Sequence, residues 1–367
     1  MKIEINKNKV YFNNGSLKKE IHPFWLRERV DGEEFLDKGT QQRLFDPTSL
    51  DSEILINRAY INDEFLEIDF NDGVNSKLNI NKLALEFSNE DIIIKSIPKT
   101  KWDSTLKNIK NYEYQDNFFE SKEMHDLLVS FYKYGFVIIK NIPTNNNFIV
   151  KFANSIGSVR KTNFGEYFDV KSKPNPNDLA YTSLNLSPHT DNPYRNPVPC
   201  IQLLHCIENE VSGGLSTLVD GFTVTEDLKN ENLEFYKILC DVKVRFKFID
   251  KEVVLEDWSE LIKLNDDKTF KQVRFSPRMD YVPILDKEKL DLYYKARKKL
   301  SEMYNSKKYK IEFKLVSKDL MMIDNYRLLH GRTAYETKEG NRFLQGCYID
   351  YDSTEGKLRH LKRKFNL

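Results

Sequence analysis

The chain has 367 residues, of which 57 are Lys or Arg and 56 are Asp or Glu, so its formal net charge is +1. This balance produces no global field that would attract nucleic acid or a membrane surface, so we expect a small molecule as partner. No apolar run approaches the length of a membrane span, and the amino terminus lacks a continuous apolar stretch, which predicts a cytoplasmic protein. The four cysteines show no CxxC pair and no regular spacing, which predicts reduced thiols without catalytic function.

The beginning of the chain predicts a small β-rich domain over residues 1–98. Short strand-like segments, among them KVYF, EILINRAYI and EFLEIDF, alternate with turn-forming clusters such as NNGS and NDG. A connection rich in lysine and asparagine follows. We therefore expect a second domain over residues 112–367.

The second domain begins with a predicted helix, KEMHDLLVSFYKYG, whose apolar spacing ends at Gly135. FVIIKNIP follows as a buried strand and NNNFIVKFANSIGSV as a helix. Beyond residue 200 strand-like segments prevail, with one clear helix, KEKLDLYYKARKKLSEMYN. Many short strands joined by long loops predict a mainly β (α+β) protein whose larger domain is an antiparallel jelly roll, rather than a parallel α/β sheet.

A candidate metal site begins in the stretch LSPHTDNPYRNPVPC, where one residue separates His189 from Asp191. On an extended segment both side chains leave the same face. A third ligand is available at His330, which follows the strand LMMIDNY and precedes Gly331, a residue expected to give the backbone room beside a ligand. Two imidazoles and one carboxylate form the facial set of non-haem Fe(II) oxygenases. Because an HxD pair alone is common in loops, the spacing leaves an ordinary loop as the alternative.

Two further residues favour an oxygenase. Arg342 lies twelve residues beyond His330, so its guanidinium could point from a neighbouring strand into the same barrel and hold a dicarboxylate at two points. Ser216, which follows a glycine pair, supplies a hydroxyl donor for the same carboxylate. The alternatives are a surface salt bridge for Arg342 and a strand-end hydroxyl for Ser216. A non-catalytic sensor or a zinc hydrolase could use the same three ligands, but neither needs a dicarboxylate clamp.

Two side chains before His330 are candidates for orienting it. Asp324 and Asn325 lie at the end of the preceding predicted strand, close enough to hydrogen-bond to a metal-bound imidazole. Ordinary hydrogen bonding at a strand end is the alternative.

Four colinear blocks, HTDNPYRNPVPCIQLLHC, GGLSTLVDGF, DNYRLLHGRTAY and RFLQGCYIDYD, resemble the γ-butyrobetaine dioxygenase and trimethyllysine dioxygenase family of Fe(II)/2-oxoglutarate oxygenases. The resemblance runs from about Tyr134 to the carboxyl terminus and extends to HPFWLRER in the first domain. It implies a double-stranded β-helix catalytic domain that binds Fe(II), 2-oxoglutarate and O2, with ascorbate as the reductant in vitro, and it suggests a homodimer. The implied iron ligands are His189, Asp191 and His330, and the implied 2-oxoglutarate ligands are Arg342 and Ser216.

The same resemblance implies a quaternary-ammonium substrate held in an aromatic cage. A trimethylammonium group cannot be recognised by hydrogen bonds through its methyl groups, so its sites use aromatic faces. Core packing is the alternative for any one of these rings. The implied cage positions are Phe164, Phe168, Tyr181 and Tyr348, and Tyr194 is expected on the substrate side as well.

The opposite end of the substrate is where the chain departs from the butyrobetaine enzymes. Asp178 stands where those enzymes have an asparagine, and it would repel a substrate carboxylate, although the trimethyllysine relatives also have Asp there. Ser276 and Arg278 stand where eukaryotic relatives offer asparagines, and Arg278 either pairs with Asp178 or faces a strongly anionic group. HTDNPYRNPVP is also similar to the bacterial enzyme that hydroxylates 2-(trimethylamino)ethylphosphonate. We expect that phosphonate as substrate, with γ-butyrobetaine and trimethyllysine as alternatives.

The first domain departs from the family in a second way. In γ-butyrobetaine dioxygenase this domain holds a structural zinc through cysteines that follow the WLR motif, but WLRERVDGEEFLDKGTQQRLF contains no cysteine. We therefore expect a zinc-free variant of the domain. The side chains expected to hold it together by packing are Phe24, Trp25, Phe35 and Leu44.

Overall fold

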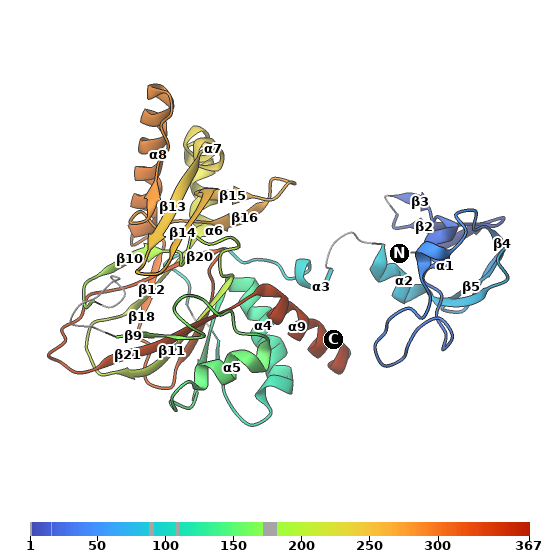
Figure 1. Cartoon of the computed structure of the whole chain (residues 1–367), viewed down its shortest axis with the longest axis horizontal. Helices are drawn as coiled ribbons and strands as arrows, with labels where there is room; N and C mark the ends of the chain where they lie inside the picture. The colour runs from blue at the N-terminus through green and yellow to red at the C-terminus, as the bar shows by residue number, and fades with distance from the viewer. Residues whose placement is uncertain (1, 16, 88–91, 108–109, 172–181) are drawn as a thin grey trace. The chain divides into compact units, whose positions relative to one another are not determined.

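The computed structural model describes residues 2–15, 17–87, 92–107, 110–171 and 182–367. The chain divides into two compact units, residues 1–96 and 97–367 (Figure 1). Within the described ranges, none of the helices combines the length and the apolar character that crossing a bilayer requires.

The first unit contains two three-stranded antiparallel sheets and short helices around one apolar core. In the fifth strand the sequence FLEIDF alternates, so that Leu66, Ile68 and Phe70 are buried while the residues between them are more exposed. The elements are β1 (Lys2–Asn6), β2 (Lys9–Asn13), β3 (Lys18–Glu20), α1 (Pro23–Arg27), η1 (Pro47–Ser49), β4 (Ile56–Asn62), β5 (Phe65–Phe70), β6 (Asn75–Asn79), α2 (Ile80–Glu86) and α3 (Ile92–Lys95).

A buried arginine, rather than thiolates, organises the loop between α1 and β4. Arg27 donates from Nε to Asp72 at 2.7 Å, and its guanidinium lies 5.5 Å from the ring centroid of Phe35 and 5.3 Å from that of Phe45. Cation–π contacts of this kind are stronger when the cation is removed from water. The expectation that Leu44 packs here is wrong, because Leu44 is 56% exposed and the ring of Phe45 packs against the core instead.

The second unit is built on two sheets that enclose a common core, which confirms the predicted jelly roll. All neighbouring strands are antiparallel except the pair β7 and β8. The larger sheet has the order β7 (Asn111–Glu113), β8 (Phe136–Lys140), β19 (Leu320–Asp324), β11 (Ile201–Asn209), β21 (Arg342–Ile349) and β9 (Phe168–Val170). The smaller sheet has the order β10 (Leu186–His189), β20 (Leu328–Arg332), β12 (Ser216–Asp220) and β18 (Lys310–Phe313).

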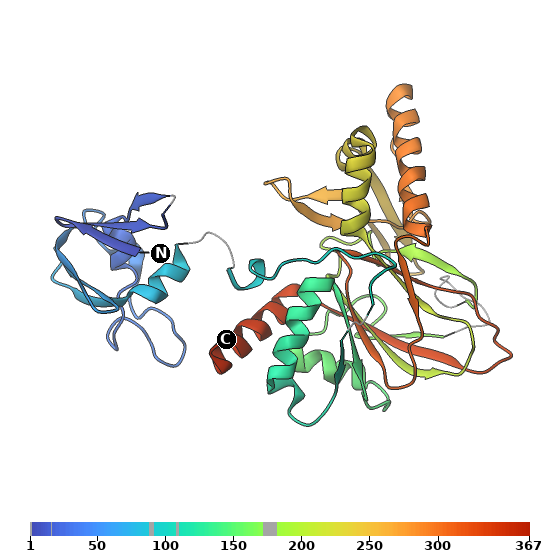
Figure 2. The same cartoon turned by 180° about the vertical axis from the view of Figure 1, so that it is seen from behind.

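Helices cover the larger sheet on the side away from the smaller one (Figure 2). The predicted helix around residues 122–134 forms as expected, because Ser121 accepts a hydrogen bond from Met124 N and Gly135 ends the helix with a φ of 81°. It packs against β8 and against the carboxyl-terminal helix. The helices are η2 (Phe118–Glu120), α4 (Lys122–Tyr134), α5 (Phe148–Ile156) and α9 (Tyr351–Phe365).

A long insertion between β12 and β18 carries helices that the sequence did not reveal. One helix was expected in this part of the chain, but two more precede it, each with a side-chain cap: Asp220 accepts from Phe222 N, and Asn232 accepts from Phe235 N. Their β-branched and aromatic residues look strand-like, and packing against one another and against the third helix overrides that preference. The elements are α6 (Gly221–Glu231), α7 (Leu233–Asp241), β13 (Lys243–Ile249), β14 (Val254–Glu260), β15 (Ile262–Leu264), β16 (Phe270–Val273), β17 (Asp280–Tyr281) and α8 (Lys287–Asn305).

Candidate active site

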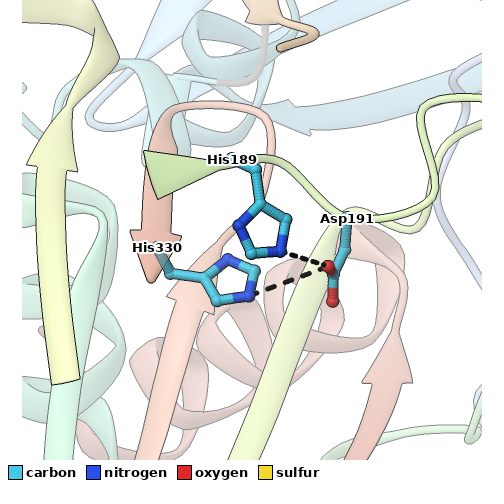
Figure 3. Close-up of side chains that lie close together, drawn as sticks. All are labelled: His189, Asp191 and His330. Atoms are coloured by element: carbon cyan, nitrogen blue, oxygen red, sulfur yellow. Dashed lines mark ion pairs between the residues drawn. The ribbon is translucent and has the colours of Figure 1, made fainter. Parts of the chain in front are cut away.

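His189, Asp191 and His330 point toward one another, with their ligand atoms within 4.8 Å of each other (Figure 3). His189 ends β10 and lies opposite His330 on the neighbouring strand β20, so the two rings come within 4.5 Å of each other, measured between centroids. The residue between the first two, Thr190, exchanges hydrogen bonds with the main chain of Phe275, which fixes this turn of the chain. The predicted combination of two imidazoles and one carboxylate is therefore assembled from two adjacent strands and the turn that follows β10.

The geometry of this triad fits a metal ion. Nε2 of His189 lies 3.4 Å from Oδ1 of Asp191, and Nε2 of His330 lies 3.7 Å from the same oxygen. Ligand atoms at right angles around a metal with bonds of about 2.1 Å lie roughly 3 Å apart, so both nitrogen–oxygen distances exceed that spacing by less than about 1 Å. His189 directs Nδ1 at Ser187 O, 2.9 Å away, which leaves Nε2 for the metal. Burial lowers the pKa of His330 to about 4, so its ring is neutral at neutral pH, as ligation requires.

The carboxylate of Asp191 is held in its ionised form. Burial alone would raise its pKa, but the two histidine rings and a hydrogen bond from Tyr348 lower the pKa below its usual value. Its other oxygen, Oδ2, accepts from Gln202 Nε2 at 2.5 Å and from the Tyr348 hydroxyl at 2.7 Å. The Gln202 contact could not be predicted from the sequence, because a glutamine inside an apolar strand has no motif of its own.

Asn325 holds the main chain of Asp191, and not His330 as the sequence suggested. The side-chain oxygen of Asn325 accepts from Asp191 N at 2.8 Å, and its amide nitrogen donates to Asp191 O at 3.1 Å. Asp324 instead accepts from the Tyr351 hydroxyl at 2.5 Å. The strand end before His330 therefore positions the carboxylate ligand rather than the imidazole.

One cavity extends from the triad between the two sheets, and both predicted 2-oxoglutarate ligands line it. Arg342 and Ser216 face it from β21 and from β12. Arg342 is buried and donates from Nε to Gly214 O at 3.2 Å. Gly214 has a φ of +63°, and a Cβ atom at this position would lie 2.7 Å from that same Nε, so glycine leaves the space that the guanidinium occupies.

Arg332 lines the same cavity and was missed from the sequence. It stands two residues after His330 on β20, so strand alternation alone places both side chains on one face of the sheet. Its guanidinium donates to the carbonyl oxygens of Thr182 and Leu184. Gly331 lies between the two residues, and a Cβ atom there would come within 2.3 Å of Leu186 O. Gly331 also lines this cavity, so the residue leaves room for the neighbouring strand as well as lying beside the candidate site.

A second cavity shares His189 and Asp191 with the first, and its lining includes four Phe or Tyr rings. Its lining residues are Phe164, Phe168, Val170, His189, Asp191, Asn192, Tyr194, Arg278, Met279 and Tyr348. The ring centroids of Phe168 and Tyr348 lie 5.4 Å apart, and those of Phe164 and Phe168 lie 6.3 Å apart. Phe248, which the sequence did not single out, stacks on Tyr194 at 4.8 Å and supports this wall.

The remaining predicted substrate residues fall in different places. Arg278 is exposed and lines the second cavity. Ser276 is fully buried and lines neither cavity, and its hydroxyl has no hydrogen-bond partner within the described part of the chain. Asp178 and Tyr181 lie outside the described residues.

Sequence comparisons place the chain among dioxygenases. The family model described as "Taurine catabolism dioxygenase TauD, TfdA family" matches residues 105–348. Gamma-butyrobetaine dioxygenase of Pseudomonas sp. (strain AK-1) is 27% identical over 348 residues, which is 94% of this chain and 91% of that protein. The Homo sapiens enzyme of the same name is 31% identical over 278 residues, 72% of this chain and 69% of its own. Mitochondrial trimethyllysine dioxygenase of Bos taurus is 27% identical over 356 residues, 92% and 82% of the two chains.

Comparison with solved structures supports the fold. An asparagine oxygenase, crystallised with Fe(II), 2S,3S-3-hydroxyasparagine and succinate, superposes with a TM-score of 0.51 at 12% identity. The match covers 65% of this chain and 93% of that one. The similarity in fold therefore extends over almost the whole of that chain.

Proposed function

The chain belongs to the taurine catabolism dioxygenase family of TauD and TfdA, and from this premise we propose that it hydroxylates a C–H bond of a small trimethylammonium compound. It is an Fe(II)- and 2-oxoglutarate-dependent dioxygenase. The observation that carries the proposal is the position of the triad, because His189 and Asp191 line both the cavity that contains Arg342 and the aromatic cavity. Co-substrate and substrate would thus meet at one ion.

Different residues of the chain would hold the metal and the co-substrate. His189, Asp191 and His330 would hold Fe(II), and Arg342 with Ser216 would hold the far carboxylate of 2-oxoglutarate. Bound together, iron and 2-oxoglutarate supply oxygen activation for hydroxylation, with succinate and carbon dioxide as co-products. The protein's contribution is to place one carbon of the substrate nearest the ion, because activated oxygen reacts with whichever C–H bond lies within its reach.

The aromatic cavity suits the cationic end of such a substrate. The Phe164, Phe168 and Tyr348 rings lie next to one another in its lining, and a quaternary ammonium ion is attracted to ring faces by about 0.5–2 kcal/mol per contact. The relatives named above also support this substrate class, since their names are gamma-butyrobetaine dioxygenase and trimethyllysine dioxygenase.

Among the described residues that line this cavity, Arg278 carries a permanent positive charge, and it would receive the anionic end of the substrate. A phosphonate offers three acceptor oxygens to a guanidinium, which favours 2-(trimethylamino)ethylphosphonate. The names of the relatives favour a carboxylate, as in γ-butyrobetaine. We therefore propose the phosphonate as substrate and retain γ-butyrobetaine and trimethyllysine as the alternatives.

A substrate panel tests this choice. Succinate release, measured with Fe(II), ascorbate, O2 and 2-oxoglutarate, is expected to rise most with 2-(trimethylamino)ethylphosphonate and less with γ-butyrobetaine, trimethyllysine, glycine betaine and carnitine. Arg278→Met should raise the KM for the preferred anionic compound about 10- to 100-fold, as expected for a lost charge-assisted hydrogen bond. If γ-butyrobetaine is the one compound turned over, the phosphonate is not the substrate and the anionic end of the substrate is a carboxylate. Binding of 2-oxoglutarate without succinate release for any compound would overturn the proposed substrate class and leave either an oxygenase whose substrate lacks a trimethylammonium group or a sensor.

Arg342→Met tests the assignment of the co-substrate cavity. Losing the two-point clamp is expected to raise the KM for 2-oxoglutarate about 10- to 100-fold, while kcat at saturation changes less. The KM of Arg342→Lys for 2-oxoglutarate should lie between the values of wild type and Arg342→Met. Lysine keeps the positive charge but lacks the paired N–H donors of the guanidinium. Initial rates at a fixed substrate concentration measure both constants, and an unchanged KM in Arg342→Met would remove this residue from the co-substrate site.

A further inference from the structure

We propose that Gln202 is a positioning residue that, together with Tyr348, fixes Asp191 as a ligand through one oxygen. The inference rests on the proposed function, because it takes the triad as the iron site. The oxygen held is Oδ2, which faces away from the histidines. Tyr348 would therefore restrain this oxygen as well as line the aromatic cavity.

The two donors reach Asp191 from neighbouring strands. Gln202 on β11 lies directly opposite Tyr348 on β21, so their side chains leave the same face of the sheet. Both are buried, with exposed fractions of 2% and 4%, and both point at Oδ2 of Asp191, from 2.5 and 2.7 Å. Oδ1 remains on the side of the two histidine nitrogens.

The orientation of the Gln202 amide follows from elementary chemistry. An ionised carboxylate only accepts hydrogen bonds, so the amide nitrogen must face Asp191 and the amide oxygen must face away. That oxygen, Oε1, is buried and has no hydrogen-bond partner among the residues that the structure describes. Gln202 also lines the cavity beside the triad, so the hydrogen bond from its amide to Asp191 lies at the metal-binding carboxylate.

Holding Oδ2 has a direct consequence for the metal. A facial set of three protein ligands leaves three positions open, which 2-oxoglutarate and oxygen need. If Asp191 rotated and bound through both oxygens, it would occupy one of those positions. Two hydrogen bonds to Oδ2 oppose this rotation at the carboxylate. Two further hydrogen bonds from Asn325 hold the main chain of Asp191.

The test is an anaerobic titration of the full chain with Co(II), followed by its visible absorption. Gln202→Met removes one donor at nearly constant volume, and Tyr348→Phe removes the other while keeping the ring. Each single variant is expected to bind Co(II) about 10-fold more weakly, within the range for residues that support metal ligands. In the double variant the Co(II) affinity should fall by a factor larger than the product of the two single-variant factors. The reason is that either donor alone still restrains Oδ2. The Co(II) absorption bands should shift in the double variant as the carboxylate rotates.

Gln345→Met is the matched control. Gln345 is equally buried and lies three residues from Tyr348 on β21, but its amide donates to Asp169 at 3.1 Å and it lines neither cavity. Its Co(II) affinity and absorption should equal those of wild type. Metal-free Gln202→Met should unfold within a few degrees of wild type, whereas a large drop in its melting temperature together with weaker binding would indicate a merely structural role and overturn the inference.

The possible failures are distinguishable. If wild type and His189→Ala bind Co(II) alike, the triad is not the metal site, and the proposed function fails. If wild type binds Co(II) at the triad and both Gln202→Met and Tyr348→Phe retain its affinity and spectrum, only the inference is overturned.

Discussion

Asp191→Ala is expected to abolish substrate-dependent succinate release, with a loss of more than about 10³-fold. The variant removes one of three metal ligands and the negative charge of the site, so its effect should exceed the 10- to 100-fold typical of residues that only support a ligand. It also leaves His189 and His330 without the carboxylate oxygen that lies 3.4 and 3.7 Å from their Nε2 atoms. Two neutral imidazoles alone hold a divalent ion weakly compared with a set that includes an anion.

The loss should appear in binding as well as in turnover. Anaerobic titration with Fe(II) is expected to give no measurable occupancy of Asp191→Ala at concentrations that saturate wild type, and His189→Ala should behave in the same way. His205→Leu is a suitable control, because His205 is a fully buried imidazole that lines neither cavity, and this variant should keep wild-type occupancy. Residual activity of Asp191→Ala above one per cent would contradict the assignment of the ligands.

Much of the candidate site could be predicted because it depends on local rules. The i, i+2 spacing of His189 and Asp191 places both side chains on one side of an extended segment, and β10 together with the turn that follows it preserves this arrangement. The same rule would have found Arg332, two residues after His330 on the strand β20. Alternation along a strand therefore identifies which residues share a face, provided that the strand itself is recognised.

Other contacts could not be predicted because they depend on how separate strands and turns come together. Gln202 on β11 reaches Asp191 in the turn after β10, and nothing near position 202 indicates a polar partner. Asn325 binds Asp191 across 134 residues of chain, although its proximity in sequence suggested His330. Helices α6 and α7 were missed for a related reason, since their packing against each other and against α8 outweighs a strand-like composition.

The buried pair of Asp220 and Arg327 offers the largest expected effect on stability. Arg327 Nε and Nη2 donate to the two carboxylate oxygens of Asp220 at 2.9 and 2.7 Å, and both residues are at most 2% exposed. Arg327 also donates to Thr100 O and Lys133 O, while Asp220 accepts from the main chain of Trp102. This ion pair therefore connects the segment that enters the catalytic unit with the end of α4 and the start of α6.

Asp220→Ala is expected to reduce the free energy of unfolding by about 3–5 kcal/mol, because it leaves a guanidinium buried without its counter-charge. The double variant Asp220→Leu/Arg327→Met should be less destabilised than Asp220→Ala, since no unpaired charge remains, although the lost cap of α6 still costs about 1 kcal/mol. Urea unfolding of the metal-free chain measures both effects. Glu302→Ala, which breaks an exposed pair with Lys298, should change stability by less than about 1 kcal/mol. If Asp220→Ala and Glu302→Ala reduced the free energy of unfolding equally, burial of the Arg327 charge would not determine the destabilisation.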